Sequence, residues 1–158
     1  MNSRFPLAVF YFVSVAALAA CGKAEFYDVK YDITADPFAD VQSAMAEARK
    51  TGKNILLDVG GEWCIWCHRL DSLFLGNKDL AQYLTENYVP LKINFSGANK
   101  NEKFLSQYPE IQGYPHLFVL DPGGTLIHSQ DTGQLEEGKK HSKEKVLAFL
   151  KKWSPKKN

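Results

Sequence analysis

Residues 54–68 read NILLDVGGEWCIWCH, and this stretch decides the fold. Its first six residues form a short apolar run interrupted by one acid, Asp58, which is typical of a central strand buried on both faces of a sheet. Two glycines end the run. The pattern then predicts a helix over 64–75 that begins at the first of two cysteines, so a buried strand leads directly into a cysteine-bearing helix.

The spacing of Cys64 and Cys67 favours redox chemistry at sulfur. A thiol in the first turn of a helix lies among unpaired backbone N–H groups at the positive end of the helix dipole, and both favour the thiolate. Cys67 lies one turn further on the same face and can close a small disulfide ring. A lowered pKa also makes Cys64 a good leaving group when Cys67 attacks a mixed disulfide. We therefore predict that Cys64 attacks and Cys67 resolves.

The segment 57–64, LDVGGEWC, and the tripeptide Gly113-Tyr114-Pro115 ahead of a strand resemble the thioredoxin-like superfamily. The secreted, disulfide-interchange branch is more similar than cytosolic thioredoxin. The resemblance covers roughly residues 37–153. It implies an α/β fold with a central mixed β-sheet flanked by helices.

The same resemblance implies roles for individual residues. Asp58 corresponds to the buried acid that assists proton transfer at Cys67, and a carboxyl group in an apolar strand is expected to have a raised pKa. Pro115 corresponds to the cis-proline across from the dithiol. Trp63 and Tyr114 are predicted to line the groove that binds an extended protein substrate.

Two departures from cytosolic thioredoxin bear on the direction of electron flow. Ile65-Trp66 stands where the family has Gly-Pro, and His116 follows the proline where Thr is usual. Ile65 and Trp66 add no charge or imidazole to hold the thiolate as a strong oxidant would. We therefore expect a reducing or interchange role more than a strongly oxidising one.

Patterns of apolar residues and turn signals predict the rest of the domain. Asp36-Pro37 begins a helix that Gly52 ends, and Asn77 can cap another. The order βαβαβαββα favours one mixed sheet covered by helices. The remaining predicted elements are a strand over 26–33, a helix over 77–87, a strand over 89–95, a short helix over 99–108, a hairpin of strands 116–120 and 125–130, and a helix over 142–153.

Residues 1–20 have the pattern of a secretory signal segment, with Arg4 followed by an apolar stretch of sixteen residues. At about 1.5 Å per residue such a helix is too short for the hydrocarbon core of a bilayer, roughly 30 Å thick. The end of the segment, LAACG at 18–22, resembles a bacterial lipobox, which implies that Cys21 is lipidated. Gly22 after the cysteine resembles lipoproteins sorted to the outer membrane.

The length and composition limit the remaining function classes. A chain of 158 residues has room for one domain and a short appendage. We predict a lipoprotein signal peptide over 1–20, a lipidated tether over 21–36 that can contain a first strand, and a thioredoxin-like domain over 37–158. Lysine and arginine total 19 and aspartate and glutamate 18, which argues against a nucleic-acid partner.

Three alternatives remain open at this point. Cys64-Ile65-Trp66-Cys67-His68 fits the motif for covalent c-type haem attachment, although small haem domains are mostly helical. A metal could be bound by the two cysteines with His68 or His116. A non-catalytic binding module with the same fold is the third alternative. It is disfavoured because both cysteines and Asp58 occur together.

The prediction is therefore a thiol-disulfide oxidoreductase of the bacterial cell envelope. It would be lipid-anchored, face the periplasm and need no cofactor. Its expected partners are protein thiols and disulfides and a membrane or periplasmic redox protein. His128 and His141 are expected at the surface.

Overall fold

The computed structural model describes residues 26–156. The signal segment over 1–20 and the predicted lipidation site, Cys21, lie outside these residues. Within the described residues, no helix is both long enough and apolar enough to cross a bilayer.

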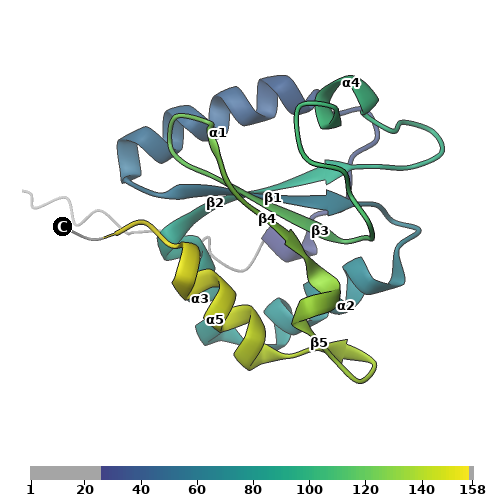
Figure 1. Cartoon of the computed structure of the whole chain (residues 1–158), viewed down its shortest axis with the longest axis vertical. Helices are drawn as coiled ribbons and strands as arrows, with labels where there is room; N and C mark the ends of the chain where they lie inside the picture. Colours follow the sequence, from purple (N-terminus) through teal and green to yellow (C-terminus); the bar gives the residue numbers. More distant parts are fainter. Residues whose placement is uncertain (1–25, 157–158) are drawn as a thin grey trace, which may run out of the picture.

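A four-stranded mixed sheet forms the centre of the molecule (Figure 1). β1 lies inside the sheet, parallel to β2 and antiparallel to β3, and β3 pairs antiparallel with β4. All seven residues of β1 are buried, as the apolar run in the sequence predicts. The order across the sheet is β2 (Tyr88–Asn94), β1 (Asn54–Gly60), β3 (His116–Leu120) and β4 (Leu126–Asp131).

Helices cover both faces of the sheet. Apolar residues of α1 and α4 pack on one face, and those of α2, α3 and α5 pack on the other (Figure 1). The α/β fold with a mixed sheet flanked by helices is therefore confirmed. The helices are α1 (Pro37–Thr51), α2 (Ile65–Gly76), α3 (Lys78–Asn87), α4 (Glu102–Leu105) and α5 (Lys143–Trp153).

The ends of α1 follow from its sequence. The Asp36 carboxylate accepts a hydrogen bond from the backbone N–H of Phe38 at 3.0 Å, and Pro37 occupies the first helical position, where its missing N–H is not needed. At the other end Gly52 adopts a left-handed conformation with φ 68°, and its N–H donates to the carbonyl of Ala48 at 2.8 Å. The predicted start and end of this helix are both confirmed.

The predicted strand over 26–33 is wrong. The chain forms one turn of 3-10 helix, η1 (Phe26–Asp28), and then an irregular segment. Tyr27 and Tyr31 are buried, whereas Val29 and Ile33, which would share a face with the two tyrosines in a strand, are 54% and 49% exposed. Tyr27 stacks on Phe74 of α2, and Tyr31 packs against the two cysteines. The alternation of apolar residues in the sequence therefore reflects two buried side chains and not a paired strand.

Three short elements between β4 and α5 have no counterpart in the prediction. They are a 3-10 helix, η2 (Thr132–Leu135), and the two strands of a small hairpin, β5 (Glu136–Glu137) and β6 (Lys140–His141). Charged residues dominate this stretch, and strands of two residues are too short to show a period. Gly138 turns the hairpin in a left-handed conformation with φ 63°. The short helix predicted over 99–108 is confined to α4.

Candidate active site

The two cysteines lie where β1 passes into α2. Cys64 is the N-cap of α2, with φ −93° and ψ 103°, and its sulfur accepts a hydrogen bond from the backbone N–H of Cys67 at 3.1 Å. The two are joined by a disulfide, with their Cα atoms 5.2 Å apart. Cys64 is 3% exposed and Cys67 is fully buried. The sulfur that the sequence analysis assigns to attack therefore lies at the positive end of the helix dipole.

Gly60 brings the end of β1 into close approach with the disulfide. A Cβ atom at this position would lie 2.5 Å from Cys67 Sγ and 3.0 Å from the hydroxyl of Tyr31. A real Cβ does not approach a backbone or sulfur atom so closely, so glycine is required here for the cysteines to sit against the strand. The Cys67 sulfur and the Tyr31 hydroxyl therefore border the same small space beside Gly60.

Asp58 is buried on β1, two residues before Gly60, with 1% of its surface exposed. Burial and the neighbouring Asp71 carboxylate raise the pKa of Asp58 to about 7, while Lys92 and the hydroxyl of Tyr31 oppose the rise. The Tyr31 hydroxyl donates to Asp58 Oδ1 at 3.0 Å, and Oδ2 has no hydrogen-bond partner among the described residues. A carboxyl group with this pKa can exchange a proton near neutrality.

Asp71 and Lys92 complete the buried polar group below the cysteines. Lys92 Nζ donates to Asp71 Oδ2 at 2.7 Å, and Lys92 is the register partner of Asp58 on the neighbouring strand. Burial raises the pKa of Asp71, and the ion pair with Lys92 offsets part of that rise. Neither residue was predicted from the sequence. Asp71 lies seven residues after Cys64, two helical turns away on the same face, and this spacing is the signal that could have found it.

The loop before β3 lies against the disulfide. β1 and β3 are antiparallel with Val59 opposite His116, which brings the loop to the end of β1 that bears the cysteines. The Tyr114–Pro115 peptide bond is cis, as the resemblance implies. Tyr114 packs against the cluster formed by Tyr31 and the two cysteines.

Aromatic rings continue from this loop to the surface. Trp63 is 57% exposed, meets Tyr114 edge-on at 5.6 Å between ring centroids, and donates from Nε1 to the carbonyl of Phe95 at 2.7 Å. Phe95 stacks on Tyr114 at 4.7 Å. Ile65, in the turn between the cysteines, is 60% exposed. Trp63 and Tyr114, predicted to bind substrate, are thus in contact beside the disulfide.

The histidines near the site are engaged in other contacts. His68 Nε2 lies 2.9 Å from the carbonyl of Glu62, and His116 Nε2 lies 2.8 Å from Ser129 Oγ. Burial lowers the pKa of His116, which favours its neutral form. Across residues 26–156, no three side chains of His, Cys, Asp or Glu are grouped so that they could hold a metal ion.

The prediction that His141 lies at the surface is wrong. It is 1% exposed, and its ring meets Trp66 edge-on at 5.5 Å between centroids. Burial, helped by the nearby Arg69, lowers the pKa of His141 to about 4. The hairpin of β5 and β6, absent from the prediction, places His141 against α2. His128 is half-buried and stacks on Trp153 at 4.1 Å.

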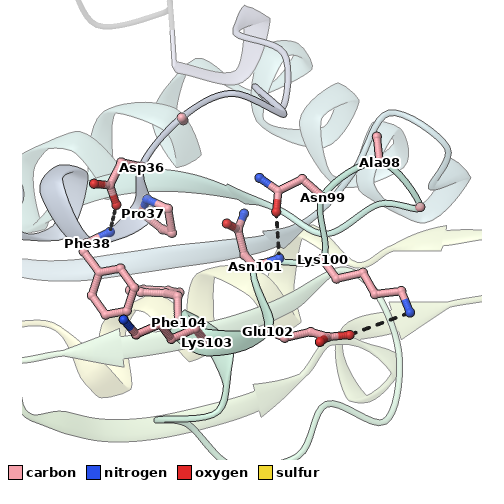
Figure 2. Close-up of a pocket in the computed structure, with 12 residues that line it drawn as sticks. Asp36, Pro37, Phe38, Ala98, Asn99, Lys100, Asn101, Glu102, Lys103 and Phe104 are labelled. Carbon is pink, nitrogen blue, oxygen red and sulfur yellow. Dashed lines mark hydrogen bonds and ion pairs between the residues drawn. The ribbon is translucent and has the colours of Figure 1, made fainter.

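A separate hollow of about 580 Å³ lies between the start of α1 and the loop that leads into α4. Figure 2 shows Phe38 and Phe104 at one end and the exposed ion pair of Lys100 and Glu102 at the other. None of the residues predicted to act in redox chemistry lines it.

The fold and the disulfide at the N-terminus of α2 define a class, that of thioredoxin-like proteins with a Cys-x-x-Cys pair. The model of the Thioredoxin-like family matches residues 36–122, and the chain belongs to this family.

Curated relatives and solved structures agree with this assignment. The chain is 27% identical over 118 residues to thiol:disulfide interchange protein DsbD of Pseudomonas fluorescens, which is 73% of this chain and 18% of that protein. It is 36% identical over 100 residues to human spermatogenesis-associated protein 20, covering 57% and 13%. The chain therefore spans less than a fifth of the length of these relatives.

The crystal structure of a disulphide isomerase from Xylella fastidiosa Temecula1 superposes with a TM-score of 0.68 and 28% identity over 77% of this chain and 94% of that chain. The C-terminal domain of Neisseria meningitidis DsbD in its oxidised form shares the fold, with a TM-score of 0.57 and 19% identity over 77% and 99% of the two chains. The chain is thus a homologue of thiol-disulfide oxidoreductases.

Proposed function

We propose that this chain exchanges disulfides with protein substrates in the bacterial cell envelope, more in the reducing or interchange direction than as a strong oxidant. One observation carries the proposal: the Cys64–Cys67 disulfide lies at a helix N-terminus, packed against Tyr114 of the cis-proline loop and against Tyr31, which donates to the buried Asp58. A pair of cysteines that served only to stabilise the fold would not need an acid that titrates near neutrality beneath it.

The reaction begins with the reduced pair. The Cys64 thiolate attacks a client disulfide, a bond forms between Cys64 and one client sulfur, and the other client sulfur leaves as a thiolate. Cys67 then loses its proton toward Asp58 and attacks Cys64. The Cys64–Cys67 bond forms while the client sulfur that was bonded to Cys64 leaves with its electron pair. The client gains two electrons, and a partner dithiol must later return two electrons to the pair.

The location is supported by the sequence before the described residues. The lipobox-like end of the signal segment makes Cys21 the proposed lipidation site, and a disulfide-exchanging pair suits an oxidising compartment. In a bacterial host, the mature chain is expected in the membrane fraction, and Cys21→Ser is expected to release it. Recovery of wild-type mature chain with no added lipid mass would refute the anchor and leave the redox proposal intact.

The redox proposal is tested with a soluble chain that begins at Gly22. The reduced protein is expected to reduce a disulfide-bonded test protein, and Cys64→Ser is expected to abolish this reduction. Cys67→Ser is expected to accumulate the mixed disulfide, which a non-reducing gel resolves. Reduction that persists in Cys64→Ser would remove Cys64 from the role proposed for it.

A further inference from the structure

Tyr31 lies between the buried acid and the disulfide. Its hydroxyl donates to Asp58 Oδ1 at 3.0 Å, and its side chain packs against both cysteines in one buried cluster. A Cβ atom added at Gly60 would lie within 3.0 Å of both the Tyr31 hydroxyl and Cys67 Sγ, so these two atoms border the same space. The oxygen of Tyr31 thus contacts the acid and borders the same space above Gly60 as the resolving sulfur.

The segment that carries Tyr31 is held in place at several points. The Tyr31 backbone N–H donates to Glu62 Oε1 at 2.9 Å, in the loop just before the cysteines. Tyr27 stacks on Phe74 of α2 with 4.0 Å between ring centroids, and the carbonyl of Ile33 accepts from Asn99 Nδ2 at 2.8 Å. The family match begins at residue 36, so Tyr31 lies outside the part of the chain that the family defines.

The charged and titratable groups that face Tyr31 come from four elements. They are Asp58 on β1, Lys92 on β2 with Nζ 4.8 Å from the ring centroid, Asp71 on α2, Glu62 in the loop and Tyr27 on η1. Burial, then the negative charges of Asp58 and Asp71, raise the pKa of Tyr31 well above its ordinary value. The phenol therefore keeps its proton at neutral pH and can accept a second hydrogen bond while donating the first.

We propose that Tyr31 relays the proton of Cys67 to Asp58 when Cys67 resolves the mixed disulfide. The inference rests on the proposed function. The S–H bond of Cys67 breaks as its proton moves to the Tyr31 oxygen, and the original phenol proton moves to the Asp58 carboxylate. Tyr31 is neutral before and after. The new thiolate of Cys67 then attacks Cys64, and the client sulfur leaves with the electron pair.

The relay is tested with 5,5′-dithiobis(2-nitrobenzoate) in a stopped-flow experiment on the reduced chain. Attack by Cys64 releases one thionitrobenzoate, and resolution by Cys67 releases a second in a later phase. In Tyr31→Phe, the second phase at neutral pH is expected to slow by about tenfold, because Cys67 must then lose its proton without the relay. The first phase is expected to change by less than about twofold, because the ring that packs on the cysteines is retained.

The pH profile separates a relay from a structural effect. The second phase in the wild type is expected to rise through an inflection near the pKa of Asp58, about 7. In Tyr31→Phe the inflection is expected to move to higher pH, and the two rates are expected to converge above it. A variant that was only misfolded or loosened would stay slow at every pH.

Two further variants complete the test. Tyr88→Phe also loses a buried phenol, one that donates to the carbonyl of Leu150 at 2.7 Å, and it is expected to leave the second phase unchanged. When Tyr31→Phe is added to Asp58→Asn, the second phase is expected to slow by less than about twofold relative to Asp58→Asn alone, because the relay has already lost its acceptor.

The relay is refuted if Tyr31→Phe keeps the wild-type rate and inflection, or if its effect is fully additive with that of Asp58→Asn. A wild-type protein that shows no second phase would instead refute the proposed function, which keeps the two outcomes distinct.

Discussion

Asp58 gives the folded protein a greater affinity for protons than the unfolded chain has. Its pKa is about 7 in the folded state against 3.8 for an ordinary aspartate. Between these values the folded state binds more protons, so the free energy of unfolding falls as the pH rises from about 4 to about 7. Asp58→Asn is expected to be more stable than the wild type at pH 8, by on the order of 4 kcal/mol, and nearly equal to it near pH 4.

Urea denaturation over a series of pH values measures this difference. Asp28→Asn, which changes an exposed carboxylate on η1, is expected to show no such trend. A wild-type stability that rises between pH 4 and pH 7 relative to Asp58→Asn would show that the carboxyl of Asp58 is ionised with a low pKa.

Trp63 combines high exposure with a fixed orientation, which suits contact with a client protein. Trp63→Ala removes an amphipathic ring beside Tyr114 and touches neither sulfur. We expect the KM for a disulfide-bonded client protein to rise by about tenfold, since a buried aromatic anchor contributes on the order of 1–2 kcal/mol to binding. Alkylation of Cys64 by iodoacetamide is expected to be unchanged.

Ile127→Ala is the matched control for Trp63, because Ile127 is an exposed apolar residue on β4 and 38% of its surface is accessible. Its KM is expected to equal that of the wild type. Equal effects of the two substitutions would mean that clients do not dock beside Trp63.

Among the elements, β1, α1 and α2 could be predicted because each has a signal confined to its own residues. β1 is a short apolar run, α1 has Asp36 and Gly52 at its ends, and α2 begins at the first cysteine. Asn77, expected to cap α3, instead donates its side-chain amide to the carbonyl of Leu73 at 2.7 Å and makes no side-chain cap. Local patterns locate an element, but they do not decide whether a side-chain amide accepts from the helix that follows or donates to the helix before it.

The ion pair of Lys92 and Asp71 joins β2 to α2. The two side chains are only 4% and 11% exposed. Lys92→Met is expected to lower the free energy of unfolding by about 3 kcal/mol at pH 8, because it leaves a buried carboxylate without its cation. The loss is expected to shrink as the pH falls, because Asp71, whose pKa is raised by burial, then takes up a proton.

Urea denaturation of Lys92→Met and of Lys92→Met/Asp71→Asn checks this prediction. The double variant is expected to recover most of the stability, since the carboxylate that pairs with Lys92 is then removed together with the lysine. A double variant as unstable as the single one would mean that packing of the lysine chain, and not its charge, is what is lost.

At the scale of the whole molecule, the segment 26–35 covers α2 and the disulfide. Tyr27 and Tyr31 are 6% and 3% exposed. A chain that begins at Ala35 loses both rings, and each is expected to cost roughly 3 kcal/mol of stability. A chain that begins at Phe26 keeps them. We expect the shorter chain to melt at a much lower temperature, as thermal unfolding followed by circular dichroism would measure. Equal melting temperatures would show that the segment contributes nothing to the fold.

The sequence was sufficient to predict the cysteine pair, Asp58 and the proline loop, because each belongs to a motif that is recognisable in a single stretch. Tyr31 and His141 could not be found in this way. Tyr31 meets Asp58 across 27 positions of sequence, and His141 meets Trp66 only because a hairpin of two-residue strands folds back. Such contacts depend on how the chain closes on itself, and no local pattern encodes them.

The antiparallel pairing of β1 with β3 has a consequence for biosynthesis. Residues from position 31 to position 116 must all be in place before the disulfide has its complete surroundings. A nascent chain that has emerged only as far as α2 carries both cysteines, yet it lacks the partner strand and the proline loop. Until the ribosome has added the residues up to His116, the two cysteines lack part of the surroundings that they have in the folded protein, so the site can be assembled only in the second half of synthesis.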